Sequence, residues 1–469
     1  MLHNSDFCAI IPRVFKTPNL RGAMPRGNQC TEEGLAMAAA WILGASTCAS
    51  MIISILFFPR IHVGKLKTDS YWIITLIGAA LVLLTGTARI GDVARELTAN
   101  TPINPLKILV LFISMTVLSV FLDEVGFFSF IAAKTLRAAK SSQFTLFSAL
   151  YIAVSILTVF TSNDIIILTF TPFICYFAKN AGISPVPYLF AEFIAANTWS
   201  MALIIGNPTN IYLSTAGGIG FAEYVKVMIL PTIAAGVVSY LTLLLLFRKK
   251  LSEKITVSEC EASIKDRPLL ITGLIHLGLC TVLLAVSSYI GFEMWYVALG
   301  FAISLFVFTL IFSAARKKKP VELGACLKRA PWQLIPFVLS MFVIILALEE
   351  NGVVGNIAGF LGTDHTVFKY GAASFLSSNV INNIPMSVLF SSVTGTLEGS
   401  ARTGAIFASV VGSNIGAFLT PIGALAGMMW SSILKSHGVK FSFVKFVKYG
   451  AAVAVPTLAA ALLVLSLTV

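Results

Sequence analysis

Long runs of apolar residues separated by short polar segments fill the chain from about residue 35 to its end. A run of ~20 apolar residues is long enough to cross the hydrocarbon core of a bilayer as a helix. The pattern predicts ten such crossings, near 35–58, 71–88, 106–122, 188–215, 226–247, 268–290, 294–313, 331–350, 402–430 and 444–468. The predicted fold class is an all-α polytopic membrane protein.

Two further apolar runs, 143–179 and 367–396, are each divided by a short polar segment. The first is broken at Ser162-Asn163-Asp164 and the second at Ser378-Asn379. Each arm is shorter than a full crossing, and non-helical backbone at membrane depth is tolerated only where protein surrounds it. We therefore expect two re-entrant helical hairpins whose polar tips lie inside the membrane.

Two of the predicted crossings, 188–215 and 402–430, also carry polar breaks. A helix that stops inside the membrane leaves backbone N–H or C=O groups without partners, and proline enforces such a stop. Helix N-termini attract anions or electron-rich oxygens, whereas free carbonyls suit small cations. The prolines that we expect at the breaks are Pro172, Pro208, Pro385 and Pro421. The candidate substrate- or ion-binding residues are Ser162, Asn163, Asp164, Asn197, Thr198, Gly206, Asn207, Asn210, Ser378, Asn379, Asn382, Asn383, Ser413, Asn414 and Thr420.

The polar breaks recur at a nearly constant distance along the chain. Asn163 and Asn379 are 216 residues apart, and Asn197 and Asn414 are 217 apart. The pentapeptide LDEVG at 122–126 is likewise matched by LEENG at 348–352. Repeats with broken helices at the midplane are typical of secondary transporters. We expect a polar N-terminal extension at 1–34, a first membrane repeat at 35–247, a basic cytoplasmic linker at 248–267 and a second, inverted repeat at 268–469.

The charge distribution supports an inverted arrangement. The chain has 33 basic and 21 acidic residues and only 12% charged residues, far below a soluble protein. If the predicted crossings alternate, 23 of the 33 basic residues fall on one side, which identifies that side as cytoplasmic. The base of the first hairpin is then cytoplasmic, whereas the base of the second hairpin and the C-terminus are external. The net charge of +12 is therefore a topology signal, and we expect no nucleic-acid partner.

Asp164 is the only acidic residue at either predicted tip, and Val380 takes the corresponding place in the second half. An intramembrane carboxylate is a candidate for proton or cation coupling, with helix capping as the alternative. Glu192 lies one to two helical turns before Asn197 and is the second proton-coupling candidate. The acidic pairs at 123–124 and 349–350 fall at predicted helix ends, where water at the membrane surface can solvate a charge at little cost in free energy.

The remaining motifs exclude several classes of protein. No two of the seven cysteines have a C-x-x-C spacing, no H-E-x-x-H is present, and His276 stands alone in an apolar run. We therefore expect no metal site, no cofactor and no enzymatic activity. No G-x-x-x-x-G-K-[ST] is present, so the chain is not expected to hydrolyse ATP itself. Residues 1–34 allow two interpretations, an organelle transit peptide or a loose extension.

The Ser-Asn tips, the Gly-Asn-Pro-Thr-Asn at 206–210, the Val-Ile-Asn-Asn-Ile-Pro at 380–385 and the Gly-Ser-Asn-Ile-Gly at 412–416 resemble the ion transporter superfamily. The resemblance is to arsenical pump membrane permeases and the broader citrate-transporter-like group. It implies that 161–164 and 377–383 are hairpin-tip binding residues, and that 197–210 and 413–423 are unwound helix segments. Sodium–dicarboxylate relatives carry Ser-Asn-Thr at both tips, whereas this chain has Ser-Asn-Asp and Ser-Asn-Val. Sodium/proton antiporter relatives carry Asp-Asn-Ile-Pro in the second half, whereas the Asn-Asn-Ile-Pro at 382–385 resembles arsenite permeases more.

We accordingly expect a secondary transporter in the plasma (inner) membrane that exports an oxyanion or a metalloid hydroxide, such as arsenite or antimonite, coupled to protons. A sodium-coupled citrate, dicarboxylate or sulfate symporter is the alternative within transporters. An ion channel is the alternative from another class. The expected partners are the lipid bilayer, a small anion or metalloid substrate, and H⁺ or Na⁺ as coupling ion. A homodimer is one assembly left open.

Overall fold

The computed structural model describes residues 26–58, 60–63, 66–101, 104–138, 142–252, 263–287 and 290–469. Residues 1–25 of the predicted extension and 253–262 of the predicted linker therefore lie outside the described residues. Residues 26–34 begin a long helix, and the helix before the linker continues to Leu251, beyond the predicted boundary at 247.

The described part of the first half contains ten α-helices, one 3-10 turn and one short β-hairpin. The helices are α1 (Arg26–Phe57), α2 (Tyr71–Leu84), α3 (Ile90–Thr98), α4 (Pro105–Glu124), α5 (Phe127–Ala138), α6 (Gln143–Phe160), α7 (Asn163–Asn180), α8 (Val186–Trp199), α9 (Pro208–Ala216) and α10 (Phe221–Leu251). The 3-10 turn η1 (Ile204–Gly206) separates α8 from α9. The antiparallel strands β1 (Arg60–Val63) and β2 (Leu66–Asp69), which the sequence did not predict, join α1 to α2.

The described part of the second half repeats the same helix order. Its helices are α11 (Arg267–Ser287), α12 (Met294–Ala315), α13 (Val321–Arg329), α14 (Leu334–Glu350), α15 (Val353–Leu361), α16 (Thr366–Ile381), α17 (Asn383–Gly395), α18 (Gly399–Gly416), α19 (Leu425–Ser436) and α20 (Phe443–Thr468). Each helix of the first half thus has a counterpart ten places later. The inverted orientation of the two halves stays a prediction.

Eight helices in the described residues are long and apolar enough to cross a membrane. Seven of them coincide with predicted crossings, and the eighth, α6, is the first arm of the first predicted hairpin. The helix at 71–84 is shorter than a full span, and the predicted crossings 188–215 and 402–430 are both interrupted. The chain is an integral membrane protein made almost entirely of helices, as the pattern predicted.

The two matched pentapeptides form the same turn in each half. In the first, α4 ends at Glu124 and Gly126 has a φ of 89°; in the second, α14 ends at Glu350 and Gly352 has a φ of 77°. Glycine adopts this left-handed region without the steric penalty that a Cβ brings. Each turn redirects the chain from a buried helix into a short one, α5 or α15.

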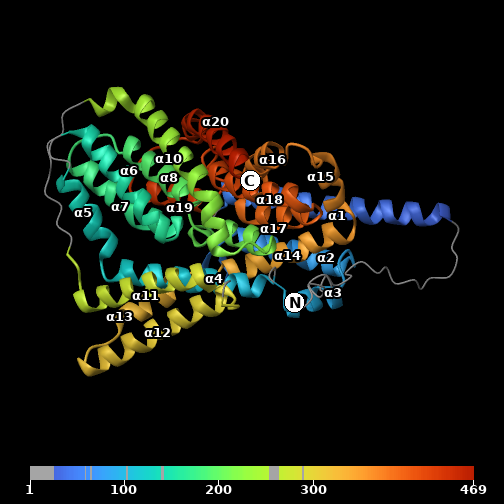
Figure 1. Ribbon diagram of the computed structural model, residues 1–469, viewed down its shortest axis with the longest axis horizontal. Coiled ribbons are helices and arrows are strands. Elements are labelled where there is room, and N and C mark those ends of the chain that lie inside the picture. The colour runs from blue at the N-terminus through green and yellow to red at the C-terminus, as the bar shows by residue number, and fades with distance from the viewer. Residues whose placement is uncertain are drawn as a thin grey trace, which may run out of the picture.

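The packing joins the halves through exchanged partners. The hairpin arm α7 packs against α19 of the second half, and the matching arm α17 packs against α9 of the first. Likewise α2 packs on α14 and α12 packs on α4. Figure 1 shows α17, α18 and α19 near the centre of the molecule, with α11 and α12 along one edge beside α4.

A cluster of aromatic rings fixes the interface of α8 with α19 and α20. Phe193 lies 5.3 Å from Trp430 and 5.5 Å from Phe446, measured between ring centroids, and Phe190 lies 5.5 Å from Phe446. All four side chains are buried. Buried aromatic groups of this size contribute strongly to packing, so they hold the two broken helices side by side.

Candidate functional site

The first hairpin tip has the predicted geometry. Helix α6 ends at Phe160, and α7 begins at Asn163 after two residues in extended conformation. Ser162 caps α7, since its hydroxyl accepts a hydrogen bond from the Asp164 amide at 3.3 Å. The positive end of the α7 dipole therefore begins at this tip.

The predicted break at Ser378-Asn379 is wrong, because the chain turns at Asn382, four residues after Ser378. Helix α16 continues through both residues to Ile381, and the chain turns at Asn382, whose φ is 71°. Asparagine tolerates this left-handed conformation better than most residues, so the turn forms at the later asparagine. Asn382 caps α17, and Ile384, not Val380, takes the place that Asp164 has in the first half.

The second tip is held by the break between α18 and α19. The side-chain amide of Asn382 donates to the carbonyl of Ile422 at 2.9 Å, and the backbone N–H of Asn383 donates to the carbonyl of Gly423 at 3.0 Å. One turn earlier, Asn379 donates to the Gly416 carbonyl at 2.9 Å and accepts from the Thr420 hydroxyl at 2.7 Å. Four candidate residues thus lie where hairpin and broken helix meet: Asn379, Asn382, Asn383 and Thr420.

The first tip is held by α8. Asn163 donates a hydrogen bond from its amide nitrogen to the side-chain oxygen of Asn197 at 3.0 Å. Asn197 in turn donates to the Phe193 carbonyl at 2.8 Å, so its amide is fixed in orientation. Both side chains are buried.

Asn414 of α18 joins the second half to the break between α8 and α9. Its side-chain oxygen accepts from Ser200 at 3.0 Å and from Asn207 at 2.9 Å, and its nitrogen donates to Asn210 at 2.7 Å. All four side chains are buried. The broken helices of the two halves are therefore cross-linked by polar side chains about 200 residues apart in sequence.

Other candidates have local roles. Thr198 and Ser378 donate to carbonyls of their own helices, Ile194 at 2.7 Å and Phe375 at 2.9 Å. A Cβ at Gly206 would collide with the Ser200 carbonyl, so the η1 turn requires glycine there. Pro172 lies inside α7 and marks no break, contrary to prediction; membrane helices tolerate such prolines because neighbouring groups satisfy the freed backbone.

Two buried polar atoms at the site have no hydrogen-bond partner in the part of the chain that the structure describes. They are the hydroxyl oxygen of Ser413, next to Asn414, and the side-chain oxygen of Asn383 at the second tip. A buried polar atom without a partner costs roughly 1–3 kcal/mol. A bound solute that pairs with these atoms would remove that cost.

The two candidate acids occupy different surroundings. Asp164 is partly exposed, and within the described ranges its carboxylate has no hydrogen-bond partner. The phenol of Tyr71, at the start of α2, lies close enough to the Asp164 carboxylate to interact with its charge. Glu192 is 1% exposed, and the hydroxyl of Thr171 lies 3.0 and 3.1 Å from its two oxygens. Asp164 is at the tip, whereas Glu192 links α8 to the middle of α7.

The helix-end acids Asp123 and Glu124 are paired. Arg329 of α13 contacts Asp123 at 2.6 Å and Glu124 at 2.5 Å, and Thr169 of α7 donates to Asp123 at 2.9 Å. The arginine thus connects the end of α4 to the hairpin arm through Asp123. We assign these acids a structural role.

A cavity of about 830 Å³ leads toward the second break. It lies between the α1–α2 connection and α19–α20, and Pro421 and Ile422 of the break line it together with Tyr71. The exposed Lys435 stands in its wall. The loops here belong to the predicted basic side of the membrane, so the predicted topology would open this cavity to the cytoplasm.

Sequence reasoning missed Ser200, Thr171 and Tyr71. Ser200 lies in the unwound segment, beside predicted residues, and a wider reading of that segment would have included it. Thr171 and Tyr71 carry no local signal, because only the packing brings them to Glu192 and Asp164.

The chain is similar to known proteins in sequence and in fold. The family described as "Citrate transporter" matches residues 69–412. An arsenical pump membrane protein of Escherichia coli is 29% identical over 413 residues, covering 84% of this chain and 93% of the relative. A putative arsenical pump membrane protein of Bacillus subtilis is 25% identical, covering 79% and 88%. The structure of Neisseria gonorrhoeae MtrF is similar in fold, with a TM-score of 0.51, 12% identity, and 92% and 95% of the two chains covered.

Proposed function

Because the chain belongs to the citrate transporter family and is a secondary anion transporter, we propose that it exports a metalloid hydroxide or small oxyanion of the arsenite and antimonite type in exchange for protons. The observation that carries the proposal is the meeting of four breaks. Helices α7, α9, α17 and α19 all begin at these breaks. Asn163 bonds to Asn197 and Asn382 to Ile422 within each half, and Asn207 bonds to Asn414 across the two halves.

Four helix N-termini at breaks connected by hydrogen bonds favour an electron-rich, oxygen-bearing solute. Their free amides and positive dipole ends stabilise oxygen atoms that carry negative charge. The unpaired oxygens of Ser413 and Asn383 suit the hydroxyl groups of a partly protonated oxyanion, because a hydroxyl donates as well as accepts. A small trihydroxide satisfies both demands, whereas a fully ionised polycarboxylate offers few donors.

Asp164 gives a simple basis for proton exchange. An ionised carboxylate at the tip accepts a strong, charge-assisted hydrogen bond from a substrate hydroxyl, whereas a protonated carboxyl group accepts a much weaker one because it has lost its charge. Substrate and proton then compete for the same group, which is the requirement for antiport. Glu192 is the second candidate, because it is buried at the contact of α7 with α8, where the Thr171 hydroxyl donates to its carboxylate. The relatives named as arsenical pump membrane proteins support this choice of substrate.

The inverted arrangement belongs to the same proposal. We place the two halves, 35–247 and 268–469, in opposite orientations, so that the tips approach the midplane from opposite faces. The exchanged packing of α7 on α19 and of α17 on α9 supports this orientation, as does the charge distribution. Alternating access then requires only that the large cavity close on one side while a matching one opens on the other.

A sodium-coupled citrate, dicarboxylate or sulfate symporter is the second candidate, and the family description favours it. Asparagine and backbone carbonyl oxygens at the tips would suit Na⁺. Stimulation of citrate uptake by sodium distinguishes this function from proton-coupled export. A channel is distinguished by flux that does not saturate.

Growth of an arsenite-sensitive bacterial host tests the proposal. Cells that express the chain should tolerate more arsenite than cells with an empty vector, because export lowers cytoplasmic arsenic. Cell-associated arsenic should fall in parallel. Equal sensitivity, with the chain present in the membrane at normal amounts, would contradict the proposed substrate.

A further inference from the structure

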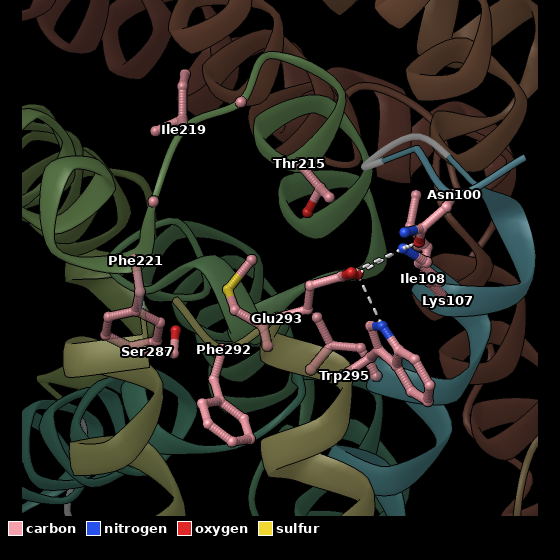
Figure 2. A pocket seen from close by; sticks show the side chains of 14 residues that line it. Asn100, Lys107, Ile108, Thr215, Ile219, Phe221, Ser287, Phe292, Glu293 and Trp295 are labelled. Carbon is pink, nitrogen blue, oxygen red and sulfur yellow. Dashed lines mark hydrogen bonds and ion pairs between the residues drawn. The ribbon is translucent and has the colours of Figure 1, made fainter. Parts of the chain in front are cut away.

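A second cavity, of about 310 Å³, lies at the end of α9, the helix that follows the break in the first half. The starts of α4, α10 and α12 form its walls, together with the end of α9, as Figure 2 shows. Its polar lining includes Lys107, Glu293 and Thr215, and its apolar lining includes Trp295 and Phe221. The charge rule assigns the loops around it to the external side.

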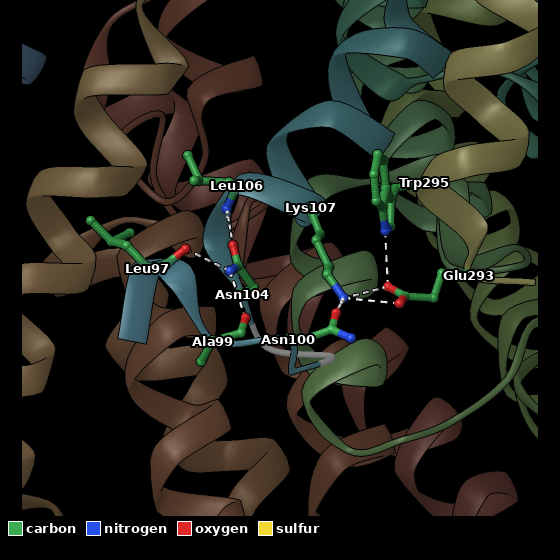
Figure 3. A network of polar contacts seen from close by, with 8 residues as sticks. All are labelled: Leu97, Ala99, Asn100, Asn104, Leu106, Lys107, Glu293 and Trp295. Carbon is green, nitrogen blue, oxygen red and sulfur yellow. Dashed lines mark hydrogen bonds and ion pairs between the residues drawn. The ribbon is translucent and has the colours of Figure 1, made fainter. Parts of the chain in front are cut away.

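Lys107 is the cation of this cavity, and it is held by two acceptors. Its ammonium lies 2.6 and 2.9 Å from the Glu293 oxygens and 2.5 Å from the Asn100 side-chain oxygen (Figure 3). Trp295 donates to the same carboxylate at 2.9 Å. Partial burial raises the pKa of Glu293, but the bonds from Lys107 and Trp295 outweigh it and lower the pKa overall, so the carboxylate stays ionised.

The Lys107 side chain lies in the first turn of α4 and has an exposed partner. Asn104 caps α4 and also donates to the carbonyls of Leu97 and Ala99, which ties the start of α4 to the end of α3. The Lys107 side chain is only 15% exposed, whereas Glu293 is 43% exposed. An ion pair with a partner this exposed contributes little free energy, so a competing anion can replace Glu293.

The Thr215 hydroxyl is a second polar group of this cavity. Its oxygen is buried and has no hydrogen-bond partner within the described ranges of the chain, and Figure 2 shows it directed into the cavity. A small oxygen-bearing solute beside Lys107 would find a cation and a hydroxyl together. The roughly 310 Å³ available is ample for a metalloid hydroxide.

A smaller cavity of about 20 Å³ adjoins the outer one, because Ile108 lines both. Its lining also includes Leu109 of α4, Pro208 and Tyr212 of α9, and Ile384 of the second tip, so it lies beside the starts of α9 and α17. It holds about one water molecule. The 830 Å³ cavity, in contrast, is lined by Pro421 and Ile422 of the other break.

The two cavities occupy matching places in the two halves. The larger is lined by the start of α2, by α19 and by the start of α20, and the smaller by the start of α12, by α9 and by the start of α10. At the position that matches the Lys107–Glu293 pair, Tyr71 donates to Gln333 at 3.4 Å, a longer and uncharged contact.

We propose that the external cavity is a second substrate site, at which Lys107 exchanges Glu293 for the departing oxyanion or hydroxide. This inference rests on the proposed export function. Lys107 binds the substrate oxygen, Thr215 accepts or donates one hydrogen bond, and Glu293 returns to Lys107 once the substrate leaves. Glu293 thereby lowers the affinity of the external site and favours release.

Inhibition of arsenite uptake by arsenite already inside the vesicles tests this site. Everted vesicles, whose lumen corresponds to the cell exterior, are preloaded with increasing arsenite, and initial uptake of labelled arsenite is measured. Lys107→Gln should raise the half-inhibiting lumenal concentration about fivefold or more, because a charged donor is lost. Glu293→Gln should lower it several-fold, because Lys107 is freed. The KM for cytoplasmic arsenite should change by less than about twofold.

The opposite signs separate a binding role from a structural one. A structural ion pair would give shifts in the same direction for both variants, or none, and either result would overturn the proposal. Lys369→Gln, which breaks the exposed pair with Asp364 on the same predicted face, is the matched control and should leave the half-inhibiting concentration unchanged.

Fluorescence distinguishes failure of this site from failure of the proposed export function. If the wild-type chain takes up no arsenite, the export function is contradicted, and the purified full chain still reports on the site through Trp295. Arsenite, citrate or sulfate that displaces Glu293 should change the tryptophan fluorescence of the chain, because Trp295 donates to the Glu293 carboxylate. Trp295→Phe should remove this change, which assigns it to Trp295. Lys107→Gln should also abolish it, because the solute no longer binds. Absence of any change with all three solutes would overturn the site.

Discussion

Asp164→Asn should abolish accumulation of substrate driven by a pH gradient, with a loss of at least about tenfold in initial rate. The amide has nearly the shape of the carboxyl group and still fits the first turn of α7, but it binds no proton. Exchange of labelled for unlabelled substrate in the absence of a pH gradient should persist, because the breaks themselves are intact. Everted vesicles with and without an imposed gradient measure both activities.

Asp364→Asn is a suitable control, since Asp364 is exposed, pairs with Lys369 and lies away from the tips. It should leave gradient-driven uptake intact. If Asp164→Asn retains full gradient dependence, Asp164 has no coupling role. Glu192→Gln would then be the remaining test among the two candidates.

Asn414→Ala should cause the second large effect, on both stability and transport. The change removes the bonds to Ser200, Asn207 and Asn210, and it leaves the buried side-chain nitrogen of Asn207 without its partner. Each unsatisfied buried group costs about 1–3 kcal/mol, so the thermal midpoint in detergent should fall by several degrees. Substrate uptake should fall at least about tenfold, because the breaks of the two halves are no longer cross-linked.

Asn356→Ala provides the comparison for this loss. Asn356 is exposed on α15 and contacts only the sulfur of Met37 through its side chain, so its removal should leave the thermal midpoint and uptake nearly unchanged. Equal behaviour of the two variants would show that the Asn414 network contributes neither to the stability of the fold nor to transport.

The membrane-spanning character and the first tip were predictable from the sequence because both depend on local properties. Apolar length determines which segments can span, and the cap at Ser162 followed by a polar pair determines where α7 begins. The breaks at Pro208 and Pro421 were predictable for the same reason, since proline acts on its own helix. The matched turns at Gly126 and Gly352 are also local.

The second tip was misplaced because its polar run offers two turns of similar quality. Residues 377–383 contain a Ser-Asn pair and an Asn-Asn pair, and only the docking of Asn382 on Ile422 selects the later one. The bonds of Asn414 across the halves depend on packing between segments about 200 residues apart. The short helices α3, α5, α13 and α15 were missed because nine to twelve residues give too weak an apolar pattern.

Arsenite flux through the purified chain in liposomes tests the central claim most directly. With a pH gradient imposed, the account predicts saturable arsenite transport that an ionophore collapsing the gradient eliminates, and no stimulation by sodium. Citrate uptake that requires sodium, with no arsenite flux, would contradict it. Arsenite flux that neither saturates nor responds to the pH gradient would contradict it equally.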